Sequence, residues 1–399
     1  MSAGSFRSTA FRSTVDEHAT HIAALLNLQP ATETVSLEDA LTRVTASAIT
    51  SPVDLPLFRN SQMDGFAVIA ADGDLPRTIV DTIPAAAGTP AALEPGTAAR
   101  IMTGAVVPEG ADAVIPVEDT SVDGDLLTVS RPRGVGEYVR ERGSDLRSGD
   151  ELLPAGILLG SRHLAALAAA GITTVDVRAR VRVAVITTGS EIVQPGATPV
   201  HGQVFDSNAT ALVAAVSAAG AVVDYRAHVA DDSALMIVAL RDAAAHVDLI
   251  LTSGGISMGD FEVVRETLEP LGARVGTVAM QPGGPQATAI YEGVPVVCFP
   301  GNPVSTQISF EVFVAPLLRE IAGMPAARRE TMTLVADLTS VTGKRQFLRG
   351  RALDEGRVAL VAGPSSHLVA ALAASDVLVI IPEETTSVKA GNPVETLAL

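Results

Sequence analysis

The chain has 399 residues, which at about 100–200 residues per domain suggests two to four domains. Hydrophobic residues make up 47% of the sequence, but aromatic residues only 3% and Trp is absent, so the cores must consist of Ala, Val, Leu and Ile. The net charge is −17 and no run rich in Lys or Arg offsets it, which argues against a nucleic-acid partner. A phosphate site in such an acidic chain must act at short range, through backbone N–H groups, a few Arg side chains or a bound cation.

Redox and targeting signals are few. The only cysteine, Cys298, lies in the apolar run 294–299, where a small buried side chain is expected and no internal disulfide is possible. The N-terminus lacks a charged start followed by an apolar core, and no uncharged apolar stretch reaches about 18 residues. We therefore expect no signal peptide, no membrane-spanning helix and a cytoplasmic location.

The first residues alternate between polar and helical patterns. Residues 1–14 are rich in Ser, Thr and Arg and are expected to be disordered. Residues 15–31 carry apolar side chains at helical spacing. Ser36-Leu-Glu-Asp39 resembles a capping box and predicts a second helix over residues 37–48.

The region 52–154 is rich in short β-type runs interrupted by Pro, Gly and Asp, which indicates a small β domain. These runs cover residues 78–83, 98–102, 113–117 and 126–129. Asp123-Gly124 between two of them is a hairpin signal. An Ala/Leu-rich helix is then predicted over residues 158–170, ending at Gly171.

Strand and helix patterns alternate in the second half, which predicts a mostly parallel sheet with helices on both faces. The strand-type runs are 181–187, 222–229, 248–252 and 294–299. The helical runs are 208–219, 233–245, 262–268 and 304–322. After a boundary at Gly323-Met-Pro325, β-type runs at 333–338, 347–352, 358–361 and 377–381 indicate a small barrel or sandwich.

Four glycine-containing turns lie in the α/β region, and three directly follow predicted strands, whose carboxyl ends bind ligands in open parallel sheets. They are Thr187-Thr-Gly-Ser-Glu191, Ser253-Gly-Gly-Ile-Ser-Met-Gly-Asp260, Gln281-Pro-Gly-Gly-Pro-Gln286 and Pro300-Gly-Asn-Pro-Val-Ser305. Their free N–H groups and hydroxyls can meet a phosphate or a pterin edge. None matches a dinucleotide or P-loop fingerprint, which disfavours a nicotinamide enzyme and an ordinary NTPase.

Carboxylates gather near these turns: Glu191, Asp206, Asp231, Asp232, Asp260 and Glu262. They could hold a Mg²⁺ ion that bridges to phosphate oxygens. Helix N-capping is an equally good reading of Asp231 and Asp232, which precede a predicted helix. The seven histidines show no zinc-type spacing.

In this order the four turns resemble the molybdopterin molybdenumtransferase family, of MoeA type and related to the gephyrin E domain. Asn60-Ser-Gln-Met-Asp-Gly-Phe-Ala67 is similar to the family's S-x-M-D-G-Y-A segment, and Arg140-Glu-Arg-Gly-Ser-Asp145 looks like its R-x-x-G-x-D. Thr103-Gly104, Phe347-Leu-Arg-Gly350 and Ser366-His367 fit as well. The resemblance covers nearly the whole chain.

The resemblance implies an elongated homodimer of multidomain α/β subunits, whose central three-layer α/β/α domain binds molybdopterin through a mostly parallel sheet. An N-terminal helical and extended segment, an inserted small β domain and a C-terminal β-barrel-like domain accompany it. The expected domains are 1–51 with 146–179 (N-terminal, segmented), 52–145 (inserted, β-rich), 180–323 (molybdopterin-binding, α/β) and 324–399 (C-terminal, β).

The activity that the resemblance implies is insertion of molybdate into adenylylated molybdopterin with release of AMP. Both substrates and Mg²⁺ would bind between the α/β domain of one subunit and the Asp64 domain of the other. Transient contacts with an adenylyltransferase and with molybdoenzymes are also implied, whereas nucleic acid and membrane are not expected partners.

Site residues are carried over by position and by turn. The expected catalytic residues are Asp64, Thr103, Glu191 and Glu262, of which Asp64 and Glu191 would also bind Mg²⁺. The expected substrate-binding residues are Arg140, Asp145, Gly189, Ser190, Asp231, Ser253, Gly254, Gly255, Ser257, Gly259, Asp260, Pro300, Gly301, Asn302, Pro303, Ser305, Arg349 and Ser366. On composition alone, Asp64-Gly65 could be an ordinary turn and Arg140 part of a solvated ion-paired edge.

The sequence departs from the family at three places where lysines are usual, which here are Thr277, Gln281 and Gly284. Replacing Lys by Gly removes a cation that could hold an oxyanion, an interaction worth about 1.5–3 kcal/mol. The alternative function is therefore a pterin-binding paralogue that is non-catalytic or has altered specificity. An adenylyltransferase acting one step earlier is a third reading, which the N- and C-terminal β domains disfavour.

Overall fold

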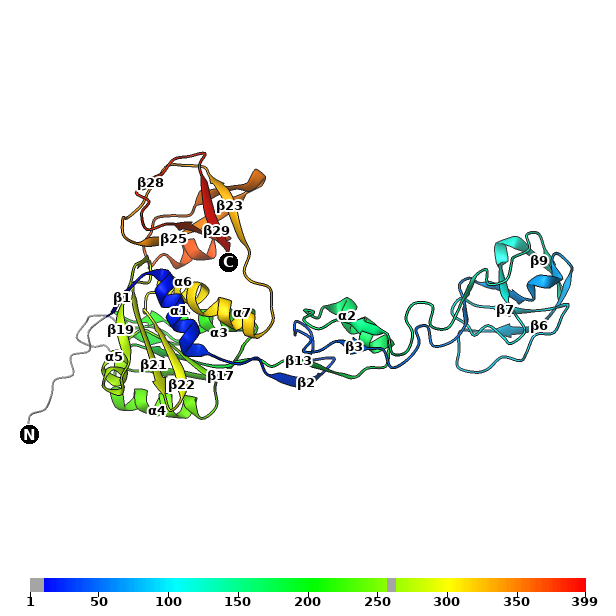
Figure 1. Ribbon diagram of the computed structural model, residues 1–399, viewed down its shortest axis with the longest axis horizontal. Helices are drawn as coiled ribbons and strands as arrows, with labels where there is room; N and C mark the ends of the chain where they lie inside the picture. The colour runs from blue at the N-terminus through cyan, green and yellow to red at the C-terminus, as the bar shows by residue number, and fades with distance from the viewer. Residues whose placement is uncertain (1–10, 257–262) are drawn as a thin grey trace, which may run out of the picture. The chain divides into compact units, whose positions relative to one another are not determined.

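The computed structural model describes residues 11–256 and 263–399, and the chain divides into two compact units, Met1–Glu33 with Arg178–Leu399 and Thr34–Val177. The larger unit is built on a seven-stranded sheet (Figure 1). In spatial order its strands are β1 (Phe11–Ser13), β19 (Arg274–Val278), β21 (Pro285–Tyr291), β22 (Val294–Phe299), β18 (Leu249–Ser253), β14 (Arg182–Thr188) and β17 (Val222–Val229). The last four are mutually parallel, as the strand and helix alternation predicted, whereas β21 runs antiparallel to both neighbours.

Helices cover both faces of this sheet and confirm the three-layer α/β/α arrangement (Figure 1). One face carries α1 (Val15–Leu26), α3 (Ser207–Ala218), α6 (Pro303–Ser309), the π-helical turn η4 (Phe310–Val314) and α7 (Ala315–Ile321). The other carries α4 (Ser233–Ala244) and α5 (Val263–Leu268). Successive residues of β14 point into the apolar cores on opposite faces of the sheet. Val183 and Val185 pack with α3, while Ala184 and Ile186 pack with α4.

The N-terminal segment is more ordered than the sequence suggested. Residues 1–10 lie outside the described residues, but Phe11–Ser13 forms β1 and pairs in parallel with β19, so the expected disorder is wrong there. The Phe11 ring explains the difference, because it stacks on His18 and lies under the guanidinium of Arg274.

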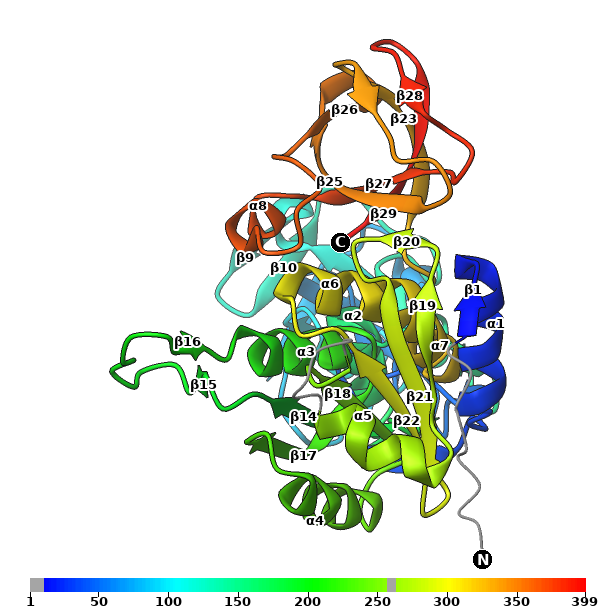
Figure 2. The ribbon, with the colours of Figure 1, turned by 90° about the vertical axis from the view of Figure 1, so that its left-hand side faces the viewer.

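The C-terminal strands close into a barrel, seen end-on in Figure 2. Around it run β25 (Arg345–Leu353), β26 (Arg357–Leu360), β23 (Arg329–Leu334), β29 (Pro393–Ala398) and β27 (Val377–Ile381), and the β25–β27 pair closes the ring. Leu334, Val358 and Val379 are fully buried inside it. The short strand β20 (Met280–Gln281) extends the barrel by pairing in parallel with β25, while the helix α8 (Val369–Ala373) precedes β27.

The smaller unit contains a six-stranded sheet with an apolar cluster on each face. Its strands are β8 (Ala113–Pro116), β5 (Gly65–Val68), β7 (Thr97–Ile101), β6 (Arg77–Ile83), β10 (Leu126–Val129) and β9 (Thr120–Asp123). Its other elements are α2 (Ser161–Ala169) and the two-stranded pairs β3 (Ile49–Thr50) with β12 (Glu151–Leu153), β4 (Asn60–Ser61) with β11 (Val139–Arg140), and β2 (Thr32–Ser36) with β13 (Thr174–Arg178). All four predicted β-type runs, the Asp123-Gly124 hairpin and the helix ending before Gly171 are confirmed.

The helix predicted over residues 37–48 is wrong. Ser36 Oγ bonds to Asp39 as a cap would, but it closes only an isolated turn. Thr42 has a left-handed φ of 62°, which no helix interior tolerates, and its N–H donates to Leu159 O. The N–H of Thr45 likewise donates to Ile157 O, so the distant segment 157–159 satisfies this backbone in place of a helix.

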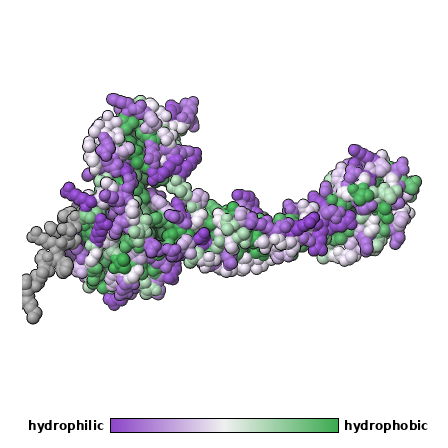
Figure 3. Space-filling view, in the orientation of Figure 1, coloured by the Kyte–Doolittle hydropathy of each residue, from purple (hydrophilic) through white to green (hydrophobic). Residues whose placement is uncertain are grey.

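Within the described residues, no helix is long and apolar enough to cross a bilayer. Figure 3 shows hydrophilic residues interspersed with apolar ones over the visible face. Cys298 is fully buried, which confirms the expectation of a small core side chain, and burial raises the pKa of its thiol to about 12.

Candidate functional site

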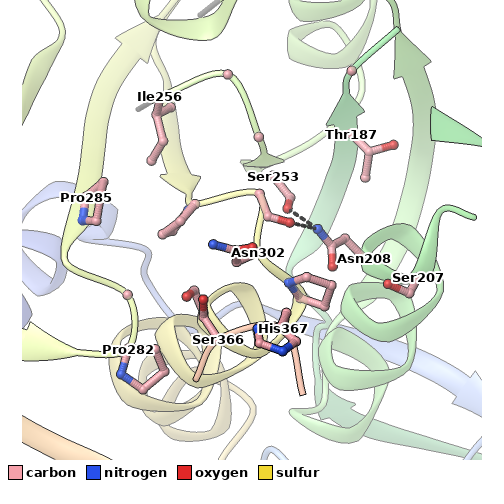
Figure 4. A pocket seen from close by; sticks show the side chains of 18 of the residues that line it. Thr187, Ser207, Asn208, Ser253, Ile256, Pro282, Pro285, Asn302, Ser366 and His367 are labelled. Carbon is pink, nitrogen blue, oxygen red and sulfur yellow. Dashed lines mark hydrogen bonds between the residues drawn. The ribbon is translucent and has the colours of Figure 1, made fainter. Parts of the chain in front are cut away.

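A cavity of about 950 Å³ opens in the larger unit at the carboxyl ends of β14, β18 and β22. All four glycine-containing turns line it, and residues 364–367 of the C-terminal part complete its wall (Figure 4). Its volume lies at the upper end of the range for small-molecule sites. The turns that the sequence singled out therefore converge on one cavity, as expected for strand ends of a parallel sheet.

A chain of hydrogen bonds joins the second and fourth turns. Asn208, at the start of α3, donates from Nδ2 to Ser253 Oγ (2.9 Å) and to Gly301 O (2.8 Å), as Figure 4 shows. Ser253 Oγ in turn bonds to Thr306 Oγ1 (3.0 Å), which donates to Pro300 O (2.6 Å). These bonds fix the two turns side by side, so their backbone positions are set before any ligand arrives.

Two polar atoms beside these turns remain unused among the described residues. Asn208 Oδ1 and Thr188 Oγ1 are buried without a hydrogen-bond partner, although both residues line the cavity. A buried polar atom left without a partner destabilises the fold, by about 1–3 kcal/mol. An N–H or hydroxyl of a bound ligand would satisfy these atoms, which supports a polar, hydrogen-bonding ligand.

Gly254 must be glycine for a steric reason. Its φ is 99°, and a Cβ there would lie 2.7 Å from Thr188 Oγ1 and 2.9 Å from Thr188 O. Gly301 packs against Gly254, because a Cβ added at Gly301 would lie 3.3 Å from Gly254 Cα. The two turns thus approach backbone to backbone.

The carboxylates near the turns divide into capping and cavity-lining groups. Asp232 caps α4 by accepting from the N–H groups of Ala234 (2.8 Å) and Leu235 (3.1 Å). Asp231 does not cap the helix. It accepts a hydrogen bond from Ser190 N (2.9 Å), and both Asp231 and Glu191 line the cavity. Asp206 caps α3 and accepts a 2.6 Å bond from Thr187 Oγ1. Capping therefore holds for Asp232 and not for Asp231, which instead lies on the cavity.

No group of three or more His, Cys, Asp or Glu side chains suited to a metal ion occurs in the part of the chain that the structure describes. Mg²⁺ is commonly held by one or two carboxylates together with substrate phosphates, so a complete protein cage is not required. Glu191 and Asp231, on the same cavity, have the donor chemistry for that arrangement.

The C-terminal wall is held from behind by a buried arginine. Arg349 is 3% exposed and donates from Nη1 to Ser365 O (2.9 Å) and from Nη2 to Gly363 O. Burial lowers the pKa of this guanidinium. Ser366 O accepts from Val304 N (3.2 Å), which ties the wall to the start of α6. Arg349 itself does not line the cavity.

In the smaller unit, Asp64 and Thr103 are directly bonded. Asp64 Oδ1 accepts from the backbone N–H (2.7 Å) and the hydroxyl (2.8 Å) of Thr103. The backbone hydrogen bond, then the hydroxyl, lowers the pKa of Asp64, so this exposed carboxylate stays ionised. Arg140 pairs with Asn60 in the adjoining β11–β4 ladder and is exposed, as is Asp145. An ordinary turn at Asp64-Gly65 would not require Thr103. It therefore does not account for the two hydrogen bonds that Thr103 donates to Asp64.

Twelve of the expected site residues therefore line one cavity: Gly189, Glu191, Asp231, Ser253, Gly254, Gly255, Pro300, Gly301, Asn302, Pro303, Ser305 and Ser366. Ser190 and Arg349 stand behind it, each bonded to its wall. Ser257, Gly259, Asp260 and Glu262 lie outside the described residues. Sequence reasoning missed Asn208 and Lys344, and it included Thr188 in the first turn without naming it as a site residue. No spacing rule marks these residues, although Lys344 could have been noticed as one of only two lysines in the chain.

Comparison with known proteins agrees with this geometry. Family models match the MoeA N-terminal region (domains I and II) over residues 13–171, a probable molybdopterin-binding domain over 184–320 and the MoeA C-terminal region (domain IV) over 331–399. Molybdopterin molybdenumtransferase 2 of Mycobacterium tuberculosis is 40% identical, over 96% of this chain and 98% of its own. The molybdopterin molybdenumtransferase of a Nostoc species is 33% identical, over 94% of this chain and 90% of its own.

Solved structures extend the similarity. A crystal structure of the molybdopterin biosynthesis MoeA protein from Pyrococcus horikoshii matches with a TM-score of 0.80 and 30% identity, covering 97% of this chain and 99% of the other. From the sequence motifs, the cavity and these matches together, the chain belongs to the MoeA family.

Proposed function

We propose that this chain is a molybdopterin molybdenumtransferase, which inserts molybdate into adenylylated molybdopterin and releases AMP. The observation that carries the proposal is that all four glycine-containing turns line one cavity, in a domain whose relatives bear this name. The volume of about 950 Å³ suits a substrate as large as a pterin joined to a nucleotide. None of the comparisons supports a non-catalytic paralogue or an adenylyltransferase as the alternative.

The residues on the cavity assign its chemistry. Backbone N–H groups at Gly255 and Gly301 would hold phosphate oxygens, while Asn208 Oδ1 would accept from the ligand. Cleaving a pyrophosphate requires donors placed for the charge that develops on the leaving phosphate. An oxygen of molybdate can attack the phosphorus of the adenylyl group and displace the pterin phosphate. The dithiolene sulfurs can then displace AMP from molybdenum, so the protein need not provide a nucleophile.

Mg²⁺ belongs to the proposal through its donors. Glu191 and Asp231 would hold the ion together with substrate phosphates, where it would neutralise charge on the pyrophosphate. Asp64, already ionised through Thr103, would act toward the same substrate if a second copy of the chain brings it there. The homodimer, a cytoplasmic location, the four-domain division and transient contacts with an adenylyltransferase and with molybdoenzymes are parts of this proposal.

The decisive test is release of AMP from purified adenylylated molybdopterin on addition of molybdate and Mg²⁺. We expect release that requires both ions and yields molybdenum cofactor able to activate an apo-molybdoenzyme. Binding of the pterin without AMP release would overturn the transferase and favour a binding paralogue. Tungstate in a parallel series would define which oxyanion is preferred.

Two matched variants sharpen that test. Asp64→Asn and Glu191→Gln should each lower the rate of AMP release by about 100-fold or more if they act on the pyrophosphate or its metal. Asp232→Asn, which alters only the cap of α4, should leave the rate nearly unchanged. A full rate in Asp64→Asn would remove this residue from the mechanism.

A further inference from the structure

One wall of the cavity carries a lone ammonium group. Lys344 is the only Lys or Arg lining the cavity in the described part of the chain, and residues 257–262 contain neither residue type. Three carboxylates, Glu191, Asp206 and Asp231, line the same space. Both substrates of the proposed reaction are anions, so Lys344 is the one strongly basic side chain on this cavity available to attract them.

The position of Lys344 follows from the strand β25, which begins at the next residue. The N–H of Arg345 donates to Ala279 O (2.9 Å), which pins the start of β25 to the third turn. Lys344 directly precedes this strand and lines the cavity, and side-chain alternation within the strand places Arg345 and Gln346 on opposite faces. Gln346 Nε2 donates to Gln281 Oε1 (2.6 Å), and Gln281 lines the cavity.

The neighbouring Arg345 cannot attract a substrate anion in the same way, because its guanidinium is already paired with two carboxylates. It forms two hydrogen bonds with Asp16, 2.7 and 2.9 Å long, and an ion pair with Glu383 at 3.1 Å. Lys344 is exposed and has no ion-pair partner within the residues that the structure covers. The other lysine of the chain, Lys389, pairs with Asp337 at 2.7 Å.

The wall beside Lys344 is otherwise uncharged. Thr277, Gln281 and Gly284 all line the cavity there and none carries a charge. Gly284 also leaves room for a side chain, since a Cβ would meet its nearest neighbours at 3.6–3.8 Å, which is ordinary contact. Among the described residues, Lys344 is therefore the one Lys or Arg on this wall, but position 284 could hold another.

Building on the proposed function, we propose that Lys344 binds a dianionic oxyanion in this cavity and thereby positions it for the transfer. The ligand is either molybdate or the diphosphate bridge of the adenylylated pterin, each of which carries two negative charges on tetrahedral oxyanion groups. The barrel thus contributes the cation, while the α/β turns contribute neutral donors.

The first experiment separates the two sources by steady-state kinetics. Lys344→Ala should raise the KM for one of the two substrates by about 10- to 100-fold, which is the range for losing one charge-assisted hydrogen bond. A raised KM for molybdate assigns the oxyanion to molybdate, and a raised KM for the pterin nucleotide assigns it to the phosphate. Lys389→Ala is the control and should change neither value. Unchanged KM values in a fully active Lys344→Ala enzyme would overturn the proposal.

The second experiment asks whether the charge or the residue matters. Adding Gly284→Lys to Lys344→Ala should restore most of the lost affinity, because the new ammonium enters the same cavity. Lys344→Arg should lose much less than Lys344→Ala, since the positive charge is kept. An Lys344→Arg enzyme as impaired as Lys344→Ala would contradict an electrostatic role.

The third experiment does not depend on turnover. With only two lysines in the chain, acylation by an N-hydroxysuccinimide ester can be followed by mass spectrometry at each of them. Molybdate or pyrophosphate should slow acylation of Lys344 and leave Lys389 as an internal reference. Protection in a protein that releases no AMP would keep this inference and reject the proposed function. Equal acylation rates with and without both anions would reject the inference.

Discussion

The two walls of the cavity are built on different principles. The α/β wall consists of turns whose positions are fixed by backbone geometry and neutral hydrogen bonds, such as those of Asn208 to Ser253 and Gly301. The barrel wall consists of residues 364–367 and Lys344, and charged side chains hold it, Arg349 from behind and Arg345 at its base. Activity should respond to small steric changes in the α/β wall and to changes of charge in the barrel wall.

Helix α1 contacts both the α/β part and the start of the barrel. Its His18 packs edge-on against Phe313 of the α/β part, with ring centroids 4.8 Å apart. Its Asp16 pairs with Arg345 at the start of the barrel. One helix therefore braces the neutral wall by apolar packing and the charged wall by an ion pair, and its two contacts can be broken separately.

The largest effect is expected from one methyl group on the α/β wall. Gly254→Ala places a Cβ 2.7 Å from Thr188 Oγ1 at a φ of 99°, so the turn must move. We expect the catalytic efficiency for AMP release to fall by about 100-fold or more, because misplacing binding groups by about 1 Å has that effect. Steady-state kinetics measures this loss.

The matched control is Gly196→Ala, whose φ of 95° is similar but whose Cβ would meet no atom within 4 Å. It shares the backbone strain, about 1–2 kcal/mol, without the collision. It does not line the cavity, so its activity should stay near that of the unaltered enzyme. Equal losses of activity in both variants would show that strain, and not close packing against Thr188, controls this wall.

The next effect tests how the barrel wall is held. Arg349→Gln leaves Ser365 O and Gly363 O without their buried donor, which should lower the free energy of unfolding by about 2 kcal/mol. It should also raise KM for a substrate that contacts Ser366. Urea denaturation and kinetics measure the two effects. Arg351→Gln, exposed on the same strand and bonded only to Ala374 O, should change both values far less.

His18 should make the brace of the α/β wall sensitive to acid. It is buried between Phe11 and Phe313, and burial, then His21 and Arg274, lowers its pKa from 6.5 to about 3. Between these values the unfolded chain takes up a proton and the folded chain does not. Stability should therefore fall as the pH drops below about 6.5, by at most roughly 1.4 kcal/mol per pH unit.

The variant His18→Phe cannot take up that proton. Its unfolding free energy, measured by urea denaturation from about pH 7 to pH 4.5, should lose less with falling pH than that of the unaltered protein. His201→Gln, at an exposed position, should keep the original pH slope. Identical slopes for His18→Phe and the unaltered protein would mean that His18 is protonated in the fold.

The sequence predicted the parallel strands and their glycine turns because both follow from local rules, apolar runs and strand-end glycines. The β19–β21 pair escaped prediction because Gly276 and Pro285 interrupt its pattern, and only pairing across the sheet completes it. Lys344 escaped for the same reason. Its place on the cavity depends on the pairing of β20 with β25, in which the paired residues lie 65 positions apart in the chain.

The smallest effect is expected where the brace meets the charged wall. Arg345 lowers the pKa of Asp16 chiefly through their hydrogen bonds, so the ion pair contributes stability above the ordinary carboxyl pKa, about 4, and loses it as the pH falls through the lower folded value. The Asp16 side chain is 76% exposed, so solvent and salt screen the pair and Asp16→Asn should cost less than about 1 kcal/mol at neutral pH. That difference, measured by thermal unfolding, should shrink in high salt and shrink further as the pH falls below the ordinary carboxyl pKa, about 4. A salt-independent loss larger than that of Arg349→Gln would mean that the ion pair, and not the buried arginine, is the main support of the barrel wall.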